Sequence, residues 1–257
     1  IRTLTRFPEI LNGRVKTLHP QVHGGILADT ENPEHLAACK EHEIKLIDLV
    51  VVNLYPFEKT VAKKGVTEEE AIENIDIGGP TMIRAAAKNF NSVAVVTSPD
   101  DYKHVAKQLQ LHKGKLPLEE RKALAIKAFK RITEYDTAIS NFFAAQKTGN
   151  EAMPAFINTS IQKVKELRYG ENPHQLAALY KADKSSKNGF HQLHGKELSY
   201  NNFLDIDAAV SIVKEFELPG AAVIKHTNPC GAAIAETIKQ AYKHAHDADP
   251  LSAFGSI

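Results

Sequence analysis

Lys225 and His226 stand side by side at the end of an apolar run, and together they could stabilise an oxyanion and move a proton. The run at 222–224 is short, apolar and β-branched, which predicts a buried strand. We expect Asn228-Pro229 to break the strand and Gly231 to open a helix. Ligands of α/β proteins bind at the carboxyl ends of strands, so the pair is expected to face a ligand. The alternative for such a pair alone is a lysine that caps a turn beside a solvent-exposed histidine.

Two cations and a hydroxyl lie on a loop bounded by Gly13 and Pro20. Arg14 supplies a planar fork and Lys16 a point charge, which suit a phosphate or a carboxylate. Thr17 adds a hydroxyl. Taken alone, the loop can also be a solvated basic segment.

Three further residues stand at expected element ends. Asp76 precedes Gly78-Gly79, where a helix start leaves backbone N–H groups unpaired. Lys88 falls near the end of that helix, where a cation also favours the helix dipole. Tyr55 ends an apolar strand, where its hydroxyl could reach a ligand, and a core tyrosine is the alternative.

Strand and helix signals alternate through the first part of the chain, which favours a parallel sheet covered by helices. The expected elements are a strand at 46–55, a capped helix from Thr67 through Glu73, a helix from Pro80 through Lys88, a strand at 92–97, a helix from Pro99 and a long helix at 118–145.

A linker at 147–150, followed by Pro154, is expected to separate two domains, 1–147 and 148–257. The second domain is expected to hold a strand near 157–161, a polar loop at 183–188, a helix at 206–216, the Lys-His strand and a helix to about His244.

Composition limits the class of protein. The 257 residues are 43% hydrophobic and 25% charged, with a net charge of +1, which predicts a globular chain without a nucleic-acid-binding surface. No apolar run approaches the ~20 residues of a membrane span and no signal peptide is visible, so we expect a cytoplasmic protein without membrane contact. Cys39 and Cys230 suggest no disulfide framework. Pro229-Cys230 lacks the second thiolate of a deaminase zinc site, so no zinc site of that kind is expected.

Together these segments resemble the AICAR transformylase/IMP cyclohydrolase family, in order and along essentially the whole chain. The matching segments are 13–20, 53–57, 75–81, 84–89, 135–138, 168–175, 201–202 and 224–231.

The resemblance implies an α/β fold, with a methylglyoxal-synthase-like parallel-sheet domain followed by the first part of a cytidine-deaminase-like α/β domain. It implies formyl transfer from 10-formyltetrahydrofolate to the aminoimidazole-carboxamide ribonucleotide AICAR. Dehydrative ring closure of formyl-AICAR to inosine monophosphate (IMP) then follows. The implied partners are these nucleotides and folate, with a homodimer at full length and no metal.

The resemblance also assigns site residues. The matching cyclohydrolase positions are Arg14, Lys16, Thr17, Tyr55, Asp76, Gly78, Gly79 and Lys88. Lys16 and Lys88 would steady the oxygen that gains charge, and Asp76 and Tyr55 would relay protons. In the transformylase, His226 matches the base and Lys225 the cation beside the oxyanion. The matching nucleotide-binding positions there are Arg168, Tyr169 and Asn202.

Two departures from the family pattern lead us to expect incomplete sites and a catalytically deficient chain. The chain begins at Ile1 without the family's phosphate-holding amino-terminal loops, and it ends within an apolar, glycine-containing stretch at 252–257. Ser256 stands where related sequences commonly have glycine. One alternative is a non-catalytic methylglyoxal-synthase-like nucleotide-binding regulatory module, which would not need Lys225-His226. Another is a methylglyoxal synthase, which would end near Thr148.

Overall fold

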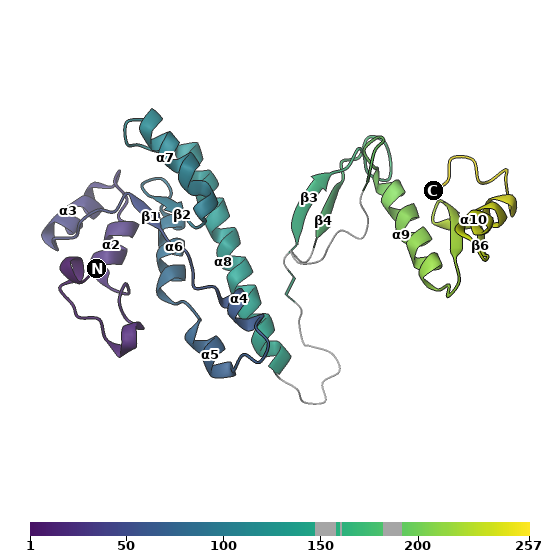
Figure 1. Ribbon diagram of the computed structural model, residues 1–257. Coiled ribbons are helices and arrows are strands. Elements are labelled where there is room, and N and C mark those ends of the chain that lie inside the picture. Colours follow the sequence, from purple (N-terminus) through teal and green to yellow (C-terminus); the bar gives the residue numbers. More distant parts are fainter. Residues whose placement is uncertain (147–157, 160, 182–191) are drawn as a thin grey trace. The chain divides into compact units, whose positions relative to one another are not determined.

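The computed structural model describes residues 1–146, 158–159, 161–181 and 192–257, and the chain forms two compact units, 1–158 and 159–257 (Figure 1). The expected domain boundary between residues 147 and 148 and the expected loop at 183–188 lie outside the described residues. Among the described residues, no helix combines the length and the apolar character needed to cross a membrane.

Unit 1 is an α/β unit in which helices surround a parallel strand pair. Its elements are α1 (Arg2–Thr5), η1 (Leu11–Gly13), α2 (Pro20–Leu27), α3 (Pro33–Glu41), β1 (Leu49–Val51), α4 (Phe57–Val61), α5 (Glu68–Glu73), α6 (Gly78–Lys88), β2 (Ala94–Val96), η2 (Pro99–Asp101), α7 (Tyr102–Leu111) and α8 (Leu118–Gln146).

The two strands of unit 1 pair in parallel, with Val50 opposite Val95. A parallel pair needs a crossover connection, and here helices α4, α5 and α6 supply it. Both strands lie inside the stretches expected from sequence, at 46–55 and 92–97, but they are shorter. Flanking hydrogen bonds extend the pairing by one residue at each end, from the Ala94 amide to the Asp48 carbonyl and from the Val52 amide to the Val96 carbonyl.

Helix α6 lies at the centre of unit 1. It packs against α8, α2 and both strands, and Figure 1 shows the long helix α8 running beside it. Ile83 and Ala86 of α6 are fully buried, as is Ala128 of α8. The small alanine side chains allow close approach of the helices, and apolar burial is the main stabilising contribution to such a core. The packing therefore fixes the position of the amino-terminal end of α6.

In its described residues, unit 2 contains two antiparallel hairpins and two helices. Its elements are β3 (Gln162–Glu166), β4 (Ala178–Lys181), α9 (Tyr200–Lys214), β5 (Gly220–Lys225), β6 (Asn228–Ile234) and α10 (Ile238–Asp247). Strand β3 pairs with β4 and β5 with β6, and both α9 and α10 contact the second hairpin. The expected helix at 206–216 is confirmed, but it begins six residues earlier, behind a capping box formed by Ser199 and Asn202.

The expectation that Asn228-Pro229 ends the strand region and that Gly231 opens a helix was wrong. The chain reverses through His226 and Thr227, whose φ angles are 52° and 63°, and returns as β6. Two consecutive left-handed residues match the twist of a tight hairpin, although glycine or asparagine usually occupies such positions. Lys225 and His226 therefore stand at a hairpin turn.

Strand β6 accommodates its proline and glycine by specific packing. Pro229 lies opposite Ile224 where the register shifts, and a bulge is one of the few places where a sheet tolerates proline. A Cβ atom on Gly231 would lie 1.9 Å from the Ala245 carbonyl oxygen of α10. Gly231 therefore permits the close approach of β6 to α10.

Candidate functional site

The loop before α6 brings a carboxylate onto the amino-terminal end of that helix. Asp76 Oδ1 accepts a hydrogen bond from the Gly79 amide at 2.8 Å, and Oδ2 accepts one from the Tyr55 amide at 3.4 Å. A carboxylate at this position pairs with otherwise unpaired N–H groups and with the positive end of the helix dipole. Asp76 thus links the start of α6 to the segment after β1.

The two glycines at the start of α6 make room for this arrangement. A Cβ atom on Gly78 would lie 2.5 Å from Thr17 Oγ1, and one on Gly79 would lie 2.6 Å from Asp76 Oδ2. The hydroxyl of Thr17 and the carboxylate of Asp76 therefore both lie against the first turn of α6. A hydroxyl and a carboxylate in one place can position a polar ligand, the hydroxyl by donating or accepting a hydrogen bond and the carboxylate by accepting one.

Arg14 and Lys16 lie on the same loop as Thr17 and carry exposed ion pairs. Arg14 pairs with Glu73 at the end of α5, and Lys16 Nζ lies 3.2 Å from a carboxylate oxygen of Glu9. Exposed pairs contribute about 0–1 kcal/mol, so a bound anion can compete for either cation.

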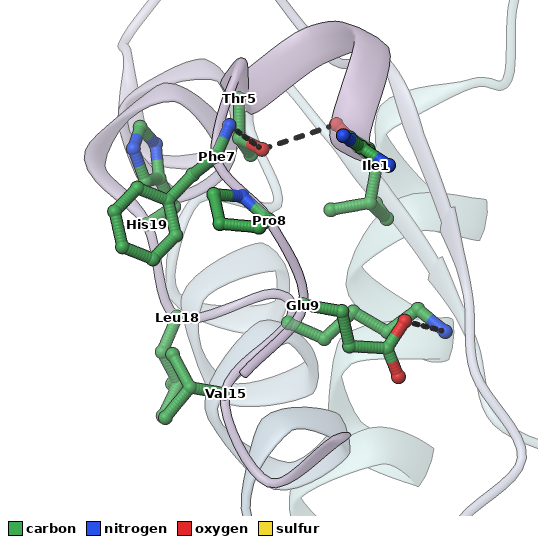
Figure 2. Close-up of a pocket in the computed structure, with 10 residues that line it drawn as sticks. Ile1, Thr5, Phe7, Pro8, Glu9, Val15, Leu18 and His19 are labelled. Atoms are coloured by element: carbon green, nitrogen blue, oxygen red, sulfur yellow. Dashed lines mark hydrogen bonds and ion pairs between the residues drawn. The ribbon is translucent and has the colours of Figure 1, made fainter. Parts of the chain in front are cut away.

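The Lys16–Glu9 pair borders a cavity of about 100 Å³ (Figure 2). Phe7, Val15 and Leu18 give this cavity an apolar lining, and His19 lies beside it. His19 is already used structurally, because its Nδ1 accepts the Gln21 amide at the start of α2.

Tyr55 contacts the group around Asp76 through its backbone, and Lys88 lies at the opposite end of α6 from that group. The Tyr55 amide donates to Asp76, while the residue as a whole is 56% exposed. Lys88 is the last residue of α6 and is exposed. It lies ten positions after Gly78, which corresponds to about 15 Å along the helix axis. The structure therefore gathers Thr17, Asp76, Gly78 and Gly79, with the Tyr55 backbone. The convergence of Lys16 and Lys88 on that group stays a prediction.

In unit 2, Lys225 and His226 occupy a turn that is held from two sides. Lys225 Nζ donates to the Phe254 carbonyl at 2.9 Å, and the Thr227 amide donates to Asp205 Oδ1 at 2.8 Å. His226 itself is exposed. A β-branched residue such as Thr227 at positive φ is strained, and such strain persists only where surrounding contacts enforce it.

Arg168, Tyr169 and Asn202 meet at the start of α9. The Arg168 guanidinium lies 4.9 Å over the Tyr169 ring, and Nη2 donates to the phenol oxygen at 3.3 Å. Hydrogen bonds from Ser199 and then from Arg168 lower the pKa of Tyr169. The Asn202 side-chain oxygen accepts both the Ser199 amide and the Ser199 hydroxyl at 3.0 Å. The buried Ser199 thus connects the Arg168–Tyr169 pair to Asn202.

Comparison with known protein families divides the chain at a different place from the two structural units. Residues 1–81 match the family model of the MGS-like domain, and residues 86–257, well over half of the chain, match that of the AICARFT/IMPCHase bienzyme. The chain belongs to the AICARFT/IMPCHase bienzyme family. The short gap between the two matched regions, residues 82–85, lies inside α6, so it does not coincide with the boundary between the structural units.

Curated relatives named "Bifunctional purine biosynthesis protein PurH" align with the whole chain. The protein of Halalkalibacterium halodurans is 52% identical over 100% of this chain and 50% of its own length, and that of Staphylococcus saprophyticus is 54% identical over 100% and 49%. The chain therefore spans about half the length of the curated relatives it matches. A solved structure titled "Crystal structure of ForH" is 40% identical, with a TM-score of 0.52, over 57% of this chain and 75% of that one.

Two residues of this bienzyme-family chain adjoin the expected site residues and were missed from sequence. Tyr135 contacts the Asp76 backbone, and Asp205 holds the Thr227 amide. The matching segment 135–138 was a signal for the first, whereas nothing local marked the second. Within the described ranges, no three His, Cys, Asp or Glu side chains form a group that could hold a metal ion, and Cys39 and Cys230 are free.

Proposed function

We propose that the chain carries the cyclohydrolase site and part of the transformylase site of a bifunctional purine-biosynthesis enzyme. Its reactions are formyl transfer from 10-formyltetrahydrofolate to AICAR and ring closure of formyl-AICAR to IMP. The observation that carries the proposal is the gathering of Thr17 and Asp76 at the Gly78-Gly79 start of α6. The proposal includes a cytidine-deaminase-like fold for unit 2, a homodimer at full length and a cytoplasmic location.

Ring closure requires a carboxamide nitrogen to attack the formyl carbon. A C–N bond forms as the carboxamide nitrogen loses a proton and the formyl oxygen gains one to become a hydroxyl. The formamido nitrogen then loses its proton and forms a double bond to the same carbon, while the hydroxyl takes up a second proton and leaves as water. Within the described residues, Asp76 Oδ2 has one backbone donor, the Tyr55 amide at 3.4 Å, so it is the oxygen better placed to accept the proton. Thr17 and the first turn of α6 would bind the nucleotide, and Arg14 and Lys16 would neutralise its phosphate. Lys88 and the Tyr55 hydroxyl complete the assignment taken from the family.

Formyl transfer requires a weakly nucleophilic amine to attack the formyl carbon of the folate. The bond from that carbon to the folate nitrogen then breaks, and this nitrogen takes up a proton as it leaves. In the proposed assignment His226 accepts the amine proton and Lys225 faces the oxygen that gains negative charge. The exposed position of His226 on a fixed turn supports its access to substrate. Arg168, Tyr169 and Asn202 would bind the nucleotide.

Binding of IMP, measured by calorimetry, tests the cyclohydrolase assignment in this chain. Thr17→Val removes the hydroxyl but keeps the shape, and we expect at least a five-fold loss of affinity, about 1 kcal/mol for one hydrogen bond. Thr133→Val is the matched control and should leave IMP affinity unchanged, because Thr133 is an exposed threonine of α8 whose hydroxyl donates to the Phe129 carbonyl of the same helix. Absence of IMP binding at millimolar concentration, or equal affinity of the Thr17→Val variant and the unchanged chain, would contradict the proposal.

A further inference from the structure

Tyr135 is a polar side chain in the interior of unit 1. It lies on α8 with none of its surface exposed, and its ring packs edge-on against Phe57 at 6.1 Å. The Arg131 guanidinium carbon lies over the same ring, 5.5 Å from its centroid. A phenylalanine would fill the same space without a hydroxyl to satisfy. A buried hydroxyl is unfavourable unless it is hydrogen-bonded, so its partners carry information about its role.

The phenol oxygen makes two hydrogen bonds, both to the loop that leads into α6. It accepts the Asp76 amide at 2.8 Å and donates to the Asn74 carbonyl at 3.2 Å. Asp76 belongs to neither a helix nor a strand. Its amide therefore donates to the Tyr135 hydroxyl instead of to a backbone carbonyl of a helix or a sheet. One side chain thus joins α8 to the 74–76 segment.

Asp76 is consequently held both through its backbone and through its side chain. Its backbone is held by Tyr135 on α8, and its carboxylate is held by the amides of Gly79 and Tyr55. Burial raises the pKa of Tyr135, so the hydroxyl keeps its proton and continues to donate and accept at neutral and moderately alkaline pH.

We propose that Tyr135 is a positioning residue for Asp76: its hydroxyl sets the backbone of the 74–76 segment so that the carboxylate lies against the first turn of α6. The importance of that position for ring closure rests on the proposed function, whereas the positioning itself is a property of this chain. Without the hydroxyl, the Asp76 amide loses the acceptor that the described residues give it, and Asp76 is then held through its carboxylate alone.

Hydrogen exchange in the chain as it is provides the first test. The Asp76 amide should exchange at least 100-fold more slowly than that of Gly65, an exposed loop residue. Exchange of Asp76 as fast as that of Gly65 would overturn the proposal without any variant.

Tyr135→Phe keeps the ring and removes both hydrogen bonds. We expect exchange at Asp76 and Gly79 to rise about ten-fold, the equivalent of about 1.4 kcal/mol, and the carboxyl carbon resonance of Asp76 to shift. Ile132→Val is the matched control: Ile132 is buried on the same helix, three residues away, and belongs to a different core cluster. It should lower global stability without moving the Asp76 carboxyl resonance.

The outcomes separate this inference from the proposed function. If Tyr135→Phe and Ile132→Val change exchange and carboxyl resonance alike, Tyr135 is only a core residue and the proposal fails. If Tyr135→Phe shifts Asp76 as expected while IMP does not bind the unchanged chain, the positioning role stands and the cyclohydrolase assignment fails. Where ring closure is measured, Tyr135→Phe should lower kcat more than it raises KM, because the carboxylate acts in the reaction itself.

Discussion

Replacing Thr227 by glycine should stabilise unit 2 while loosening the residue proposed as its base. Thr227 has a φ of 63°, and a left-handed conformation costs a residue with a Cβ about 1–2 kcal/mol. Glycine removes that strain but loses about 0.5–1 kcal/mol of additional chain entropy on folding. The contact from the Thr227 hydroxyl to the His226 carbonyl is exposed, so water replaces it at little cost. The net expectation is a gain of about 0.5–1 kcal/mol.

Amide hydrogen exchange of β5 and β6 is the suitable assay, because it reports on the opening of unit 2 alone. Thr227→Gly should slow exchange in the hairpin roughly two- to five-fold. Ala232→Gly is the matched control: Ala232 is exposed and lies within β6, so glycine there should accelerate exchange. NMR relaxation should show His226 becoming more mobile in Thr227→Gly. Faster exchange in both variants would refute the reasoning that this turn is strained.

Two further substitutions test the packing of unit 2 and the pH dependence of the stability of unit 1. Gly231→Ala places a Cβ 1.9 Å from the Ala245 carbonyl oxygen and should destabilise unit 2 by about 1–3 kcal/mol or more in urea unfolding, whereas an unchanged midpoint would show that β6 and α10 separate easily. Burial lowers the pKa of His23, so the unfolded chain binds its proton more readily than the folded one, and stability is lost as pH falls below about 6.5. His23→Gln should therefore flatten the decline in stability between about pH 6.5 and 5, and an identical decline in both chains would assign it to other groups.

Helices whose signals are local could be predicted from the sequence. Thr67 accepts the Glu70 amide at the start of α5, and the apolar spacing of α8 predicted residues 118–145 where the helix covers Leu118–Gln146. The start of α9 was placed six residues late. Its capping box uses Asn202 at the position where glutamate or glutamine usually stands, so the pattern did not stand out.

Features that depend on pairing between distant segments could not be predicted in the same way. The hairpin of β5 and β6 was missed because His226 and Thr227 are unusual turn residues and Pro229 normally excludes a strand. Its stability comes from α9 and α10, which pack on it from elsewhere in the sequence. The helix expected at Gly231 was therefore an error of local reasoning.

In the candidate site, too, the residue types could be predicted from local sequence, whereas the contacts between distant segments could not. The residue types at Thr17, Asp76 and Gly78-Gly79 could be selected from the sequence, because loops before helices are suited to anions. Their proximity required the fold, since Thr17 and Gly78 lie on separate segments that meet only through packing. The matching segment 135–138 includes Tyr135, but a tyrosine in a long amphipathic helix gives no local indication of what its hydroxyl contacts, so its role could not be predicted.

A crystal structure of the chain with IMP would test most directly the central claim that the start of α6 is the nucleotide site of unit 1. The account predicts that the nucleotide lies within hydrogen-bond distance of Thr17 and of the first turn of α6, with the Asp76 carboxylate facing the ring that closure forms. IMP bound in the cavity lined by Phe7 and Leu18, or in unit 2 alone, would contradict it.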